Sequence, residues 1–107
     1  MSTEKSNMSI FVENNTSYVL KNITIRYRDD ELKFKKLKKH MTEKKIAHIG
    51  SDTSFDITLD IGEKHIKINN VGYYYYNGQD SVRLIFNNDR LLENTSNDKH
   101  YIGYSYR

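Results

Sequence analysis

Hydrophobic and polar residues alternate along most of this chain, and the alternation predicts β-strands. In the range 54–61 every second residue is apolar: Phe55, Ile57, Leu59 and Ile61. A period of two residues places all four on one face of a strand and the polar residues between them on the other. We expect further strands over the ranges 8–13, 19–28, 64–68, 71–76, 81–87 and 101–106.

Short polar segments between these ranges predict tight turns. Gly62-Glu63 suits a two-residue hairpin loop. A hairpin closed there pairs Leu59 with Ile66 on one face and Asp60 with His65 on the other. Apolar side chains then face apolar ones and an acid faces a base, so the register is self-consistent.

Two further turns and one exception complete the pattern. Closing a hairpin at Asp29-Asp30 pairs Arg26 with Lys33, and this like-charge pair indicates either an anionic partner or a different register. Asn69-Asn70 predicts a turn, because Asn tolerates the left-handed backbone region. The stretch Lys35–Lys45 has a composition that favours helix, for which we expect at most a few turns.

The number and spacing of the strands predict an all-β fold. About eight or nine short strands, spaced by about 8–12 residues, are typical of a single antiparallel β-sandwich, and a closed barrel gives the same pattern. With 107 residues, the chain suits one domain with one core. We expect a β-sandwich domain over residues 8–107 and a disordered N-terminal tail over residues 1–7.

Residues 8–88 include three stretches with a recognisable combined pattern: VENNTSYVLKNITIRY, SFDITLDIGEKHIKI and NGQDSVRLIF. Together they resemble small bacterial proteins with an immunoglobulin-like or C2-like β-sandwich. The resemblance implies the fold and assigns no functional residue. The loop aspartates that bind calcium in C2 domains have no counterpart in this sequence.

Composition removes several kinds of chemistry. The chain has no cysteine, which excludes disulfides, thiolate zinc sites, iron–sulfur clusters and a cysteine nucleophile. It lacks the common nucleophile, phosphate-loop and zinc-protease motifs, and its four histidines show no metal-ligand spacing. We therefore expect no enzyme activity, no cofactor and no metal site. Without a signal-peptide pattern or a membrane-spanning apolar run, we expect a cytoplasmic protein.

One segment, residues 33–45, concentrates positive charge, while the rest of the chain is net negative. Its lysines are Lys33, Lys35, Lys36, Lys38, Lys39, Lys44 and Lys45. Such a segment produces a local positive field that attracts phosphates or an acidic protein surface. We select Lys35, Lys36, Lys38 and Lys39 as candidate binding residues. The alternative is a solvated segment that protects an edge strand.

A second candidate surface is the tyrosine run at 73–76. In a strand, two of these rings point to each face, and we select Tyr74 and Tyr76 as candidate binding residues. Exposed tyrosines favour interfaces because each combines a large apolar ring with a hydroxyl. The alternative is that the run forms a strand whose rings pack against neighbouring strands.

These features together predict a non-enzymatic module that binds another protein through a strand edge or the tyrosine-bearing face. An inhibitor or immunity-type factor from a bacterium or its mobile elements is one form of such a module. The alternative is non-specific binding of nucleic acid, or of another anionic surface, through the 33–45 lysines. That binding weakens steeply with salt and reads no sequence, because the segment is built from lysine rather than arginine.

Overall fold

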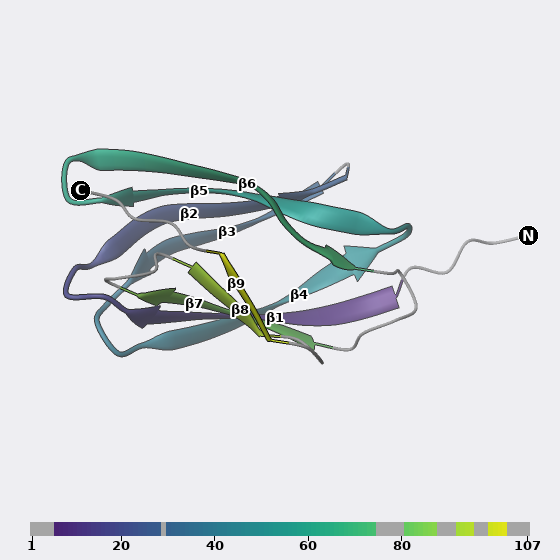
Figure 1. Cartoon of the computed structure of the whole chain (residues 1–107), viewed down its shortest axis with the longest axis horizontal. Coiled ribbons are helices and arrows are strands. Elements are labelled where there is room, and N and C mark those ends of the chain that lie inside the picture. Colours follow the sequence, from purple (N-terminus) through teal and green to yellow (C-terminus); the bar gives the residue numbers. More distant parts are fainter. Residues whose placement is uncertain (1–5, 29, 75–80, 88–91, 96–98, 103–107) are drawn as a thin grey trace, which may run out of the picture.

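The computed structural model describes residues 6–28, 30–74, 81–87, 92–95 and 99–102, which form nine β-strands and no helix (Figure 1). The strands are β1 (Ser6–Asn15), β2 (Leu20–Tyr27), β3 (Asp30–Leu37), β4 (Thr42–Ile49), β5 (Thr53–Ile61), β6 (Lys64–Tyr74), β7 (Ser81–Asn87), β8 (Leu92–Thr95) and β9 (Lys99–Ile102). No helix in these residues is long and apolar enough to cross a membrane.

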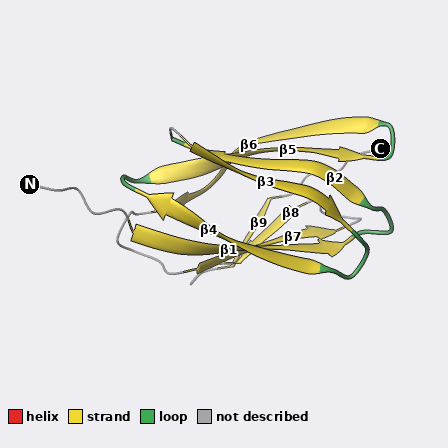
Figure 2. Ribbon diagram, turned by 180° about the vertical axis from the view of Figure 1, so that it is seen from behind, coloured by secondary structure: helices red, strands yellow, loops and turns green. Residues whose placement is uncertain are grey.

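The strands form two sheets that pack face to face, which confirms the β-sandwich (Figures 1 and 2). Sheet A has the order β4-β1-β7-β8-β9, and sheet B has the order β3-β2-β5-β6. Seven strands, β1 to β7, are seven to eleven residues long and build the sandwich. The four-residue strands β8 and β9 extend sheet A. The expected count of eight or nine strands is higher than seven because it includes such short strands.

One strand pair departs from the expected antiparallel arrangement. β1 and β7 are parallel, whereas the other paired strands in the described residues are antiparallel. A parallel pair needs a long connection, and the five strands between β1 and β7 supply it. The first, second, fourth and fifth strands share a sheet in immunoglobulin constant domains. Here strands two, three, five and six do so, and the likeness therefore concerns architecture rather than strand order.

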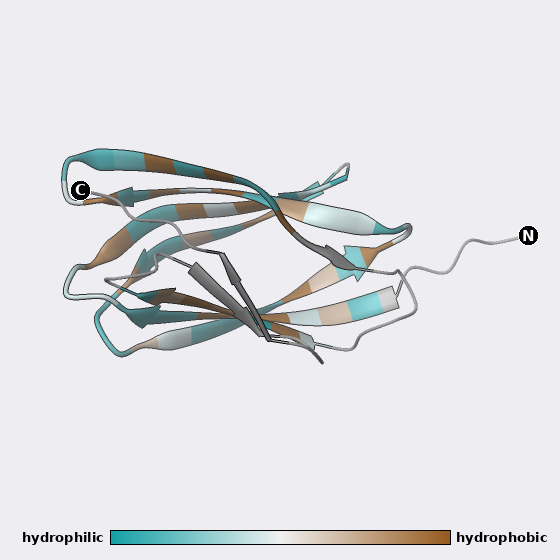
Figure 3. Ribbon diagram, viewed as in Figure 1, coloured by the Kyte–Doolittle hydropathy of each residue, from teal (hydrophilic) through white to brown (hydrophobic). Residues whose placement is uncertain are grey.

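The core lies between the two inner faces, and the alternation read from the sequence places its side chains there (Figure 3). Ile10, Ile25, Phe55 and Leu84 are fully buried, two from each sheet. Burial of one such side chain contributes roughly 1.5–3 kcal/mol to folding. Tyr27 packs edge-on against Phe55, with ring centroids 6.1 Å apart. Desolvation, and secondarily the Asp30 carboxylate, raises the pKa of Tyr27 above its ordinary value.

The hairpin between β5 and β6 has the expected register. Leu59 pairs with Ile66 and Asp60 with His65. Gly62 adopts a φ of 59°, which a glycine reaches without steric cost. The polar pairing is also real, because Asp60 Oδ1 lies 2.6 Å from His65 Nδ1.

The hairpin between β2 and β3 has a different register, and the like-charge pair expected there is wrong. Arg26 pairs with Glu31, and Lys33 pairs with Thr24, a shift of two residues. The loop falls between Tyr27 and Asp30, one residue earlier than expected, and Arg28 takes a φ of 43°. A two-residue shift keeps every side chain on its original face, so hydrophobic alternation alone does not distinguish the two registers.

Two other expectations about local structure are also wrong. Asn69-Asn70 is not a turn, because β6 continues through it with a bulge at which Asn70 has a φ of 59°. The Asp56 carboxylate accepts a hydrogen bond from the Asn70 amide at 3.0 Å. Lys35–Lys45 is not a helix but the end of β3, a turn and the start of β4. Burial of Phe34, Leu37 and later β4 residues in the sandwich overrides the helix propensity of lysine.

Two residues of the expected N-terminal tail lie in a strand. Ser6 and Asn7 belong to β1 and pair with Ile49 and His48 of β4. Residues 1–5 of the expected tail lie outside the described residues.

Candidate functional site

The segment 33–45 runs from β3, at the edge of sheet B, into β4, at the edge of sheet A (Figure 1). β3 is an edge strand of sheet B and β4 is an edge strand of sheet A. The turn at 38–41 joins them, with the amide of Met41 donating to the Lys38 carbonyl at 3.0 Å. The four candidates Lys35, Lys36, Lys38 and Lys39 are all exposed.

Lys45 has a structural role within this segment. It points inward from β4 and is half-buried. Its Nζ donates a hydrogen bond to the Lys33 carbonyl of β3 and lies 5.1 Å from the centroid of the Phe34 ring. Lys45 therefore ties the two sheet edges together, and an inward-pointing lysine also protects an edge strand from pairing with another chain. Edge protection by this lysine stays a prediction.

Asn14 holds the lysine-bearing turn in place. It is fully buried, and its Nδ2 donates to the carbonyls of Tyr18, at 2.7 Å, and Leu37, at 2.9 Å. Its Oδ1 accepts from the amide and the hydroxyl of Thr16. All four hydrogen-bonding positions of the side chain are therefore used. The sequence pattern identified Asn14 only as the end of a strand, because nothing in it shows which distant carbonyls an amide meets.

The backbone of Asn14 adds two further bonds to the same turn. Its amide donates to the Met41 carbonyl at 2.9 Å, and its carbonyl accepts from the His40 amide at 2.8 Å. His40 takes a φ of 66°, a conformation that glycine adopts more easily. The turn at 38–41 is thus positioned by the end of β1, although the two are far apart in sequence.

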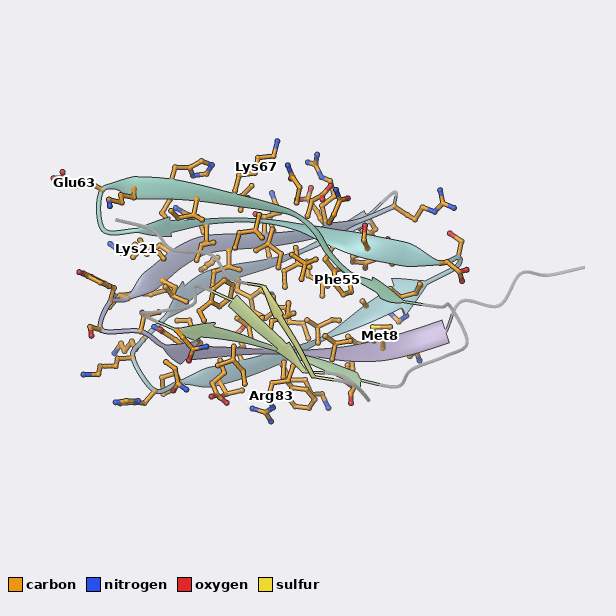
Figure 4. All side chains as sticks on the ribbon, viewed as in Figure 1. Met8, Lys21, Phe55, Glu63, Lys67 and Arg83 are labelled. Carbon is orange, nitrogen blue, oxygen red and sulfur yellow. The ribbon has the colours of Figure 1, made fainter. Side chains whose placement is uncertain are left out.

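The outer face of sheet B gathers cations from three strands. Two come from β2, three from β3 and one from β6, and we call this set the basic face: Lys21, Arg26, Lys33, Lys35, Lys36 and Lys67. All six are exposed, and Figure 4 shows Lys67 pointing away from the sandwich. None of the six forms an ion pair with any residue that the structure describes.

The strand register sets the spacing of these cations. One row across the four strands of sheet B consists of Lys33, Thr24, Thr58 and Lys67. In a second row Lys21 of β2 lies directly opposite Lys36 of β3. Like charges in directly opposed positions destabilise a sheet by a few tenths of a kcal/mol up to about 1 kcal/mol. The sequence analysis did not predict this pair, and the pair that it expected, Arg26 with Lys33, does not form.

Three carboxylates share this face without forming ion pairs with its six cations. They are Glu31, Asp56 and Asp60. Asp60 accepts hydrogen bonds from Asn22 Nδ2 at 2.8 Å and contacts His65 Nδ1. The bond from Asn22, followed by that from His65, lowers the pKa of Asp60. Asp60 is also the register partner of Lys21 between β2 and β5, but it forms no ion pair with Lys21.

A shallow hollow lies in the middle of the basic face. It has a volume of about 140 Å³ and is lined by Thr24, Arg26, Asp56, Thr58 and Lys67. A wider hollow of about 430 Å³ adjoins it and shares Arg26 and Asp56. The threonines are shorter than the charged side chains around them, which explains the depression between β2 and β5. The sequence analysis missed Lys21 and Lys67, although the polar face of each strand and a correct register reveal them. It named Arg26 only in the like-charge pair with Lys33 and did not select it as a binding residue.

The outer face of sheet A differs in character. Phe11 lies between two cations, with the Arg83 guanidinium 5.1 Å and the Lys44 Nζ 5.9 Å from its ring centroid. Arg83 also forms an ion pair with Glu13 at 2.7 Å. In the described part of the chain, the exposed large apolar side chains are Tyr18, Met41 and Ile46, and none lies on the basic face.

Of the two tyrosine candidates, the structure describes only the backbone of Tyr74. The backbone of Tyr74 ends β6 and pairs with Thr53. The side chain of Tyr74 and the whole of Tyr76 lie outside what the structure describes. Of the histidines, His65 contacts Asp60, and His48 Nδ1 lies 2.6 Å from Asn7 Oδ1. No group of three or more His, Cys, Asp or Glu side chains suited to a metal ion occurs among the described residues.

Comparisons with known proteins give a fold likeness. No protein-family model and no curated protein matches this chain. A protein from Eubacterium rectale, solved by NMR, is similar in structure, with a TM-score of 0.63. The likeness covers 86% of this chain and 89% of the other, at 18% sequence identity. It therefore supports the fold of the chain and carries no functional assignment.

Proposed function

We propose that this chain is a non-enzymatic binding module whose basic face engages an acidic surface of a partner protein. The observation that carries the proposal is the direct opposition of Lys21 and Lys36, with no ion pair to either within the described residues. Such a pair works against folding. A partner that brings carboxylates to this face offsets the repulsion, which favours the complex.

The mixed charge of the face favours a protein over a nucleic acid. Glu31, Asp56 and Asp60 lie among the cations, and a phosphate backbone is repelled by all three. A protein surface carries both signs of charge and is able to match them. The face also has no exposed aromatic ring among its described residues on which a base can stack.

One observation supports a non-enzymatic role. The pKa values that depart clearly from the ordinary in the described residues are those of Tyr27 and Asp60. Burial in the core explains the first, and hydrogen bonds from Asn22 and His65 explain the second. Displaced pKa values at catalytic groups usually occur in a cleft. The proposal retains the cytoplasmic location expected from the sequence and an inhibitor or immunity-type role.

Quantitative capture from native bacterial lysate tests the proposal. The bait is the tagged chain, and the first variant reverses the β3 part of the basic face by Lys33→Glu, Lys35→Glu and Lys36→Glu. The matched control reverses three lysines of the same segment that lie off this face: Lys38→Glu, Lys39→Glu and Lys44→Glu. The lysate is treated with nuclease so that bound nucleic acid does not bridge proteins.

The expected result is an acidic protein captured in stoichiometric amount by the wild type and by the control, and lost with the face variant. Equal loss with both variants contradicts the role of the face, as does recovery of no stoichiometric partner. Binding that disappears after nuclease treatment favours the nucleic-acid alternative.

A further inference from the structure

The hollow at the centre of the basic face is lined by two hydroxyl groups and a carboxylate as well as by cations. Attraction between opposite charges alone needs neither the hydroxyl groups nor the carboxylate. The floor of the hollow consists of the paired threonines Thr24 and Thr58, and its rim carries Arg26, Lys67 and Asp56. Hydroxyl groups both donate and accept hydrogen bonds, a guanidinium donates in a fork, and a carboxylate accepts. The hollow therefore presents directional donors and acceptors in about 140 Å³.

The orientation of the acidic member is fixed from outside the hollow. Asp56 Oδ1 accepts the hydrogen bond of the Asn70 amide, where β6 bulges with Asn70 in the left-handed region. Arg26 lies between Glu31 and Asp56 in the strand register but forms no ion pair with either. Its guanidinium thus keeps its donors available beside a carboxylate that is already held.

We infer that this hollow receives a carboxylate side chain of the acidic partner, and this inference rests on the proposed function. Arg26 supplies the bidentate fork that matches a carboxylate, while Lys67 and the two hydroxyls donate from the sides. The free acceptor capacity of Asp56 meets a backbone N–H of the same partner segment. An Asp or Glu residue in an extended segment offers both groups, whereas a free phosphate or a nucleic-acid backbone offers no such N–H donor.

The two threonines leave the middle of the central row uncharged. Lys33 and Lys67 end the row on the edge strands β3 and β6, and the two threonines separate them. A longer side chain at either threonine position would fill the depression. The partner side chain is therefore expected to enter between β2 and β5, at the centre of the face, where water is most easily excluded and binding residues contribute most.

NMR titration of the full ¹⁵N-labelled chain tests the inference. The probes are a deca-glutamate peptide, a deca-glutamine peptide of the same length, and the oligonucleotide (dT)₁₀. We expect deca-glutamate to shift the amides of Thr24, Arg26, Thr58 and Lys67 more than those of Lys38 and Lys39. Deca-glutamine is expected to leave them unmoved.

Two matched variants separate the hollow from general charge. Lys67→Gln and Lys39→Gln each remove one exposed lysine, but only Lys67 lines the hollow. We expect Lys67→Gln to weaken deca-glutamate binding roughly three- to tenfold, because Lys67 lines the hollow. We expect Lys39→Gln to weaken it less than about twofold, because an exposed charge outside the binding site contributes little to affinity. The double variant Thr24→Val and Thr58→Val keeps charge and strand preference, and we expect it to weaken binding roughly threefold or more.

Failure of this inference and failure of the proposed function give different results. If deca-glutamate binds but Lys67→Gln and Lys39→Gln weaken it equally and the valine variant binds normally, the hollow is not the carboxylate site, while the basic face stands. If (dT)₁₀ shifts the same amides more strongly than deca-glutamate, the preference for a protein carboxylate is overturned. If deca-glutamate causes no shift on the basic face, both are overturned.

Discussion

The side-chain amide of Asn14 donates a hydrogen bond to the carbonyl of Leu37, 23 residues away, at 2.9 Å. Leu37 is the last residue of β3, and the lysine-bearing turn follows it. The bond therefore connects the end of β1, in sheet A, to the end of β3, an edge strand of sheet B. The position of the turn depends on a buried polar residue of another strand.

The first prediction concerns Asn14. Asn14→Ala removes the donor to the Tyr18 and Leu37 carbonyls and the acceptor of the Thr16 amide and hydroxyl, so we expect it to reduce the free energy of unfolding by roughly 2–4 kcal/mol. Urea denaturation measures the change. The neighbouring exposed Asn15→Ala is the control, with an expected change within about 0.5 kcal/mol. A loss below about 1 kcal/mol for Asn14→Ala would show that water replaces the side chain.

A second prediction concerns the protected edge. Lys45→Thr removes the bond to the Lys33 carbonyl and the contact with Phe34, and it leaves β4 with an ordinary strand residue at an inward position. We expect a stability loss of about 1 kcal/mol and an increase in self-association. Light scattering after gel filtration measures the mass, with Lys44→Thr as the exposed control. Monomeric behaviour of both variants at high concentration would argue against edge protection.

A third prediction separates stability from binding on the basic face. Lys36→Glu converts the like-charge pair with Lys21 into an opposite-charge pair, so we expect the free energy of unfolding to rise by roughly 0.5 kcal/mol at low salt. The same variant is expected to bind the acidic partner more weakly. Thermal unfolding at 20 mM and 500 mM salt measures the electrostatic part. Unchanged or reduced stability at low salt would mean that the Lys21 and Lys36 ammonium groups point apart and do not repel each other measurably.

A fourth prediction follows from the raised pKa of Tyr27. The folded state holds the phenol protonated at a pH where the unfolded chain, with its ordinary pKa of 10.0, already ionises. Stability from this group is therefore complete below about pH 10 and falls as pH rises further. Tyr27→Phe is expected to flatten that part of the stability profile between pH 9 and 11, measured by urea titration. A variant profile parallel to that of the wild type would assign the alkaline loss to other groups.

The lowered pKa of Asp60 predicts the opposite dependence on the acid side. Its carboxylate is favoured in the folded state by Asn22 and His65, so its contribution is present above the ordinary value of 3.8 and is lost as pH falls through the lower folded value. Asp60→Asn is expected to reduce the acid sensitivity of stability below pH 4. Carboxyl chemical shifts followed through the acid range measure the titration directly, and a midpoint at or above 3.8 would contradict the account.

The sequence predicted the strands better than it predicted the surface. The alternation of Phe55, Ile57 and Leu59 is enough to assign β5 and its buried face, because a period of two has one structural meaning. The β2–β3 register was missed because a shift of two residues leaves the same side chains buried. The choice between these registers depends on the loop, where Arg28 adopts a backbone conformation that is uncommon for arginine.

The sequence predicted only part of the basic face, because the rest of the face depends on how the strands pair. Lys35 and Lys36 stand out in the sequence because they belong to a run of lysines, and the structure places both on the basic face. Lys21 and Lys67 join them only through strand pairing, which the composition of a local segment does not contain. Lys45 belongs to the same run but points inward, because it shares the inner face of β4 with the buried Ala47 and Ile49.

The most direct test of the central claim is fluorescence anisotropy with labelled deca-glutamate and labelled (dT)₁₀ at 50 and 200 mM salt. We predict that deca-glutamate binds more tightly than (dT)₁₀ at both salt concentrations, and that the Lys33, Lys35 and Lys36 reversal abolishes this binding while the Lys38, Lys39 and Lys44 reversal does not. Tighter binding of (dT)₁₀, falling about a thousandfold between the two salt concentrations as expected for six phosphate contacts, would contradict the account and favour nucleic acid. Absence of deca-glutamate binding at 50 mM salt would contradict it outright.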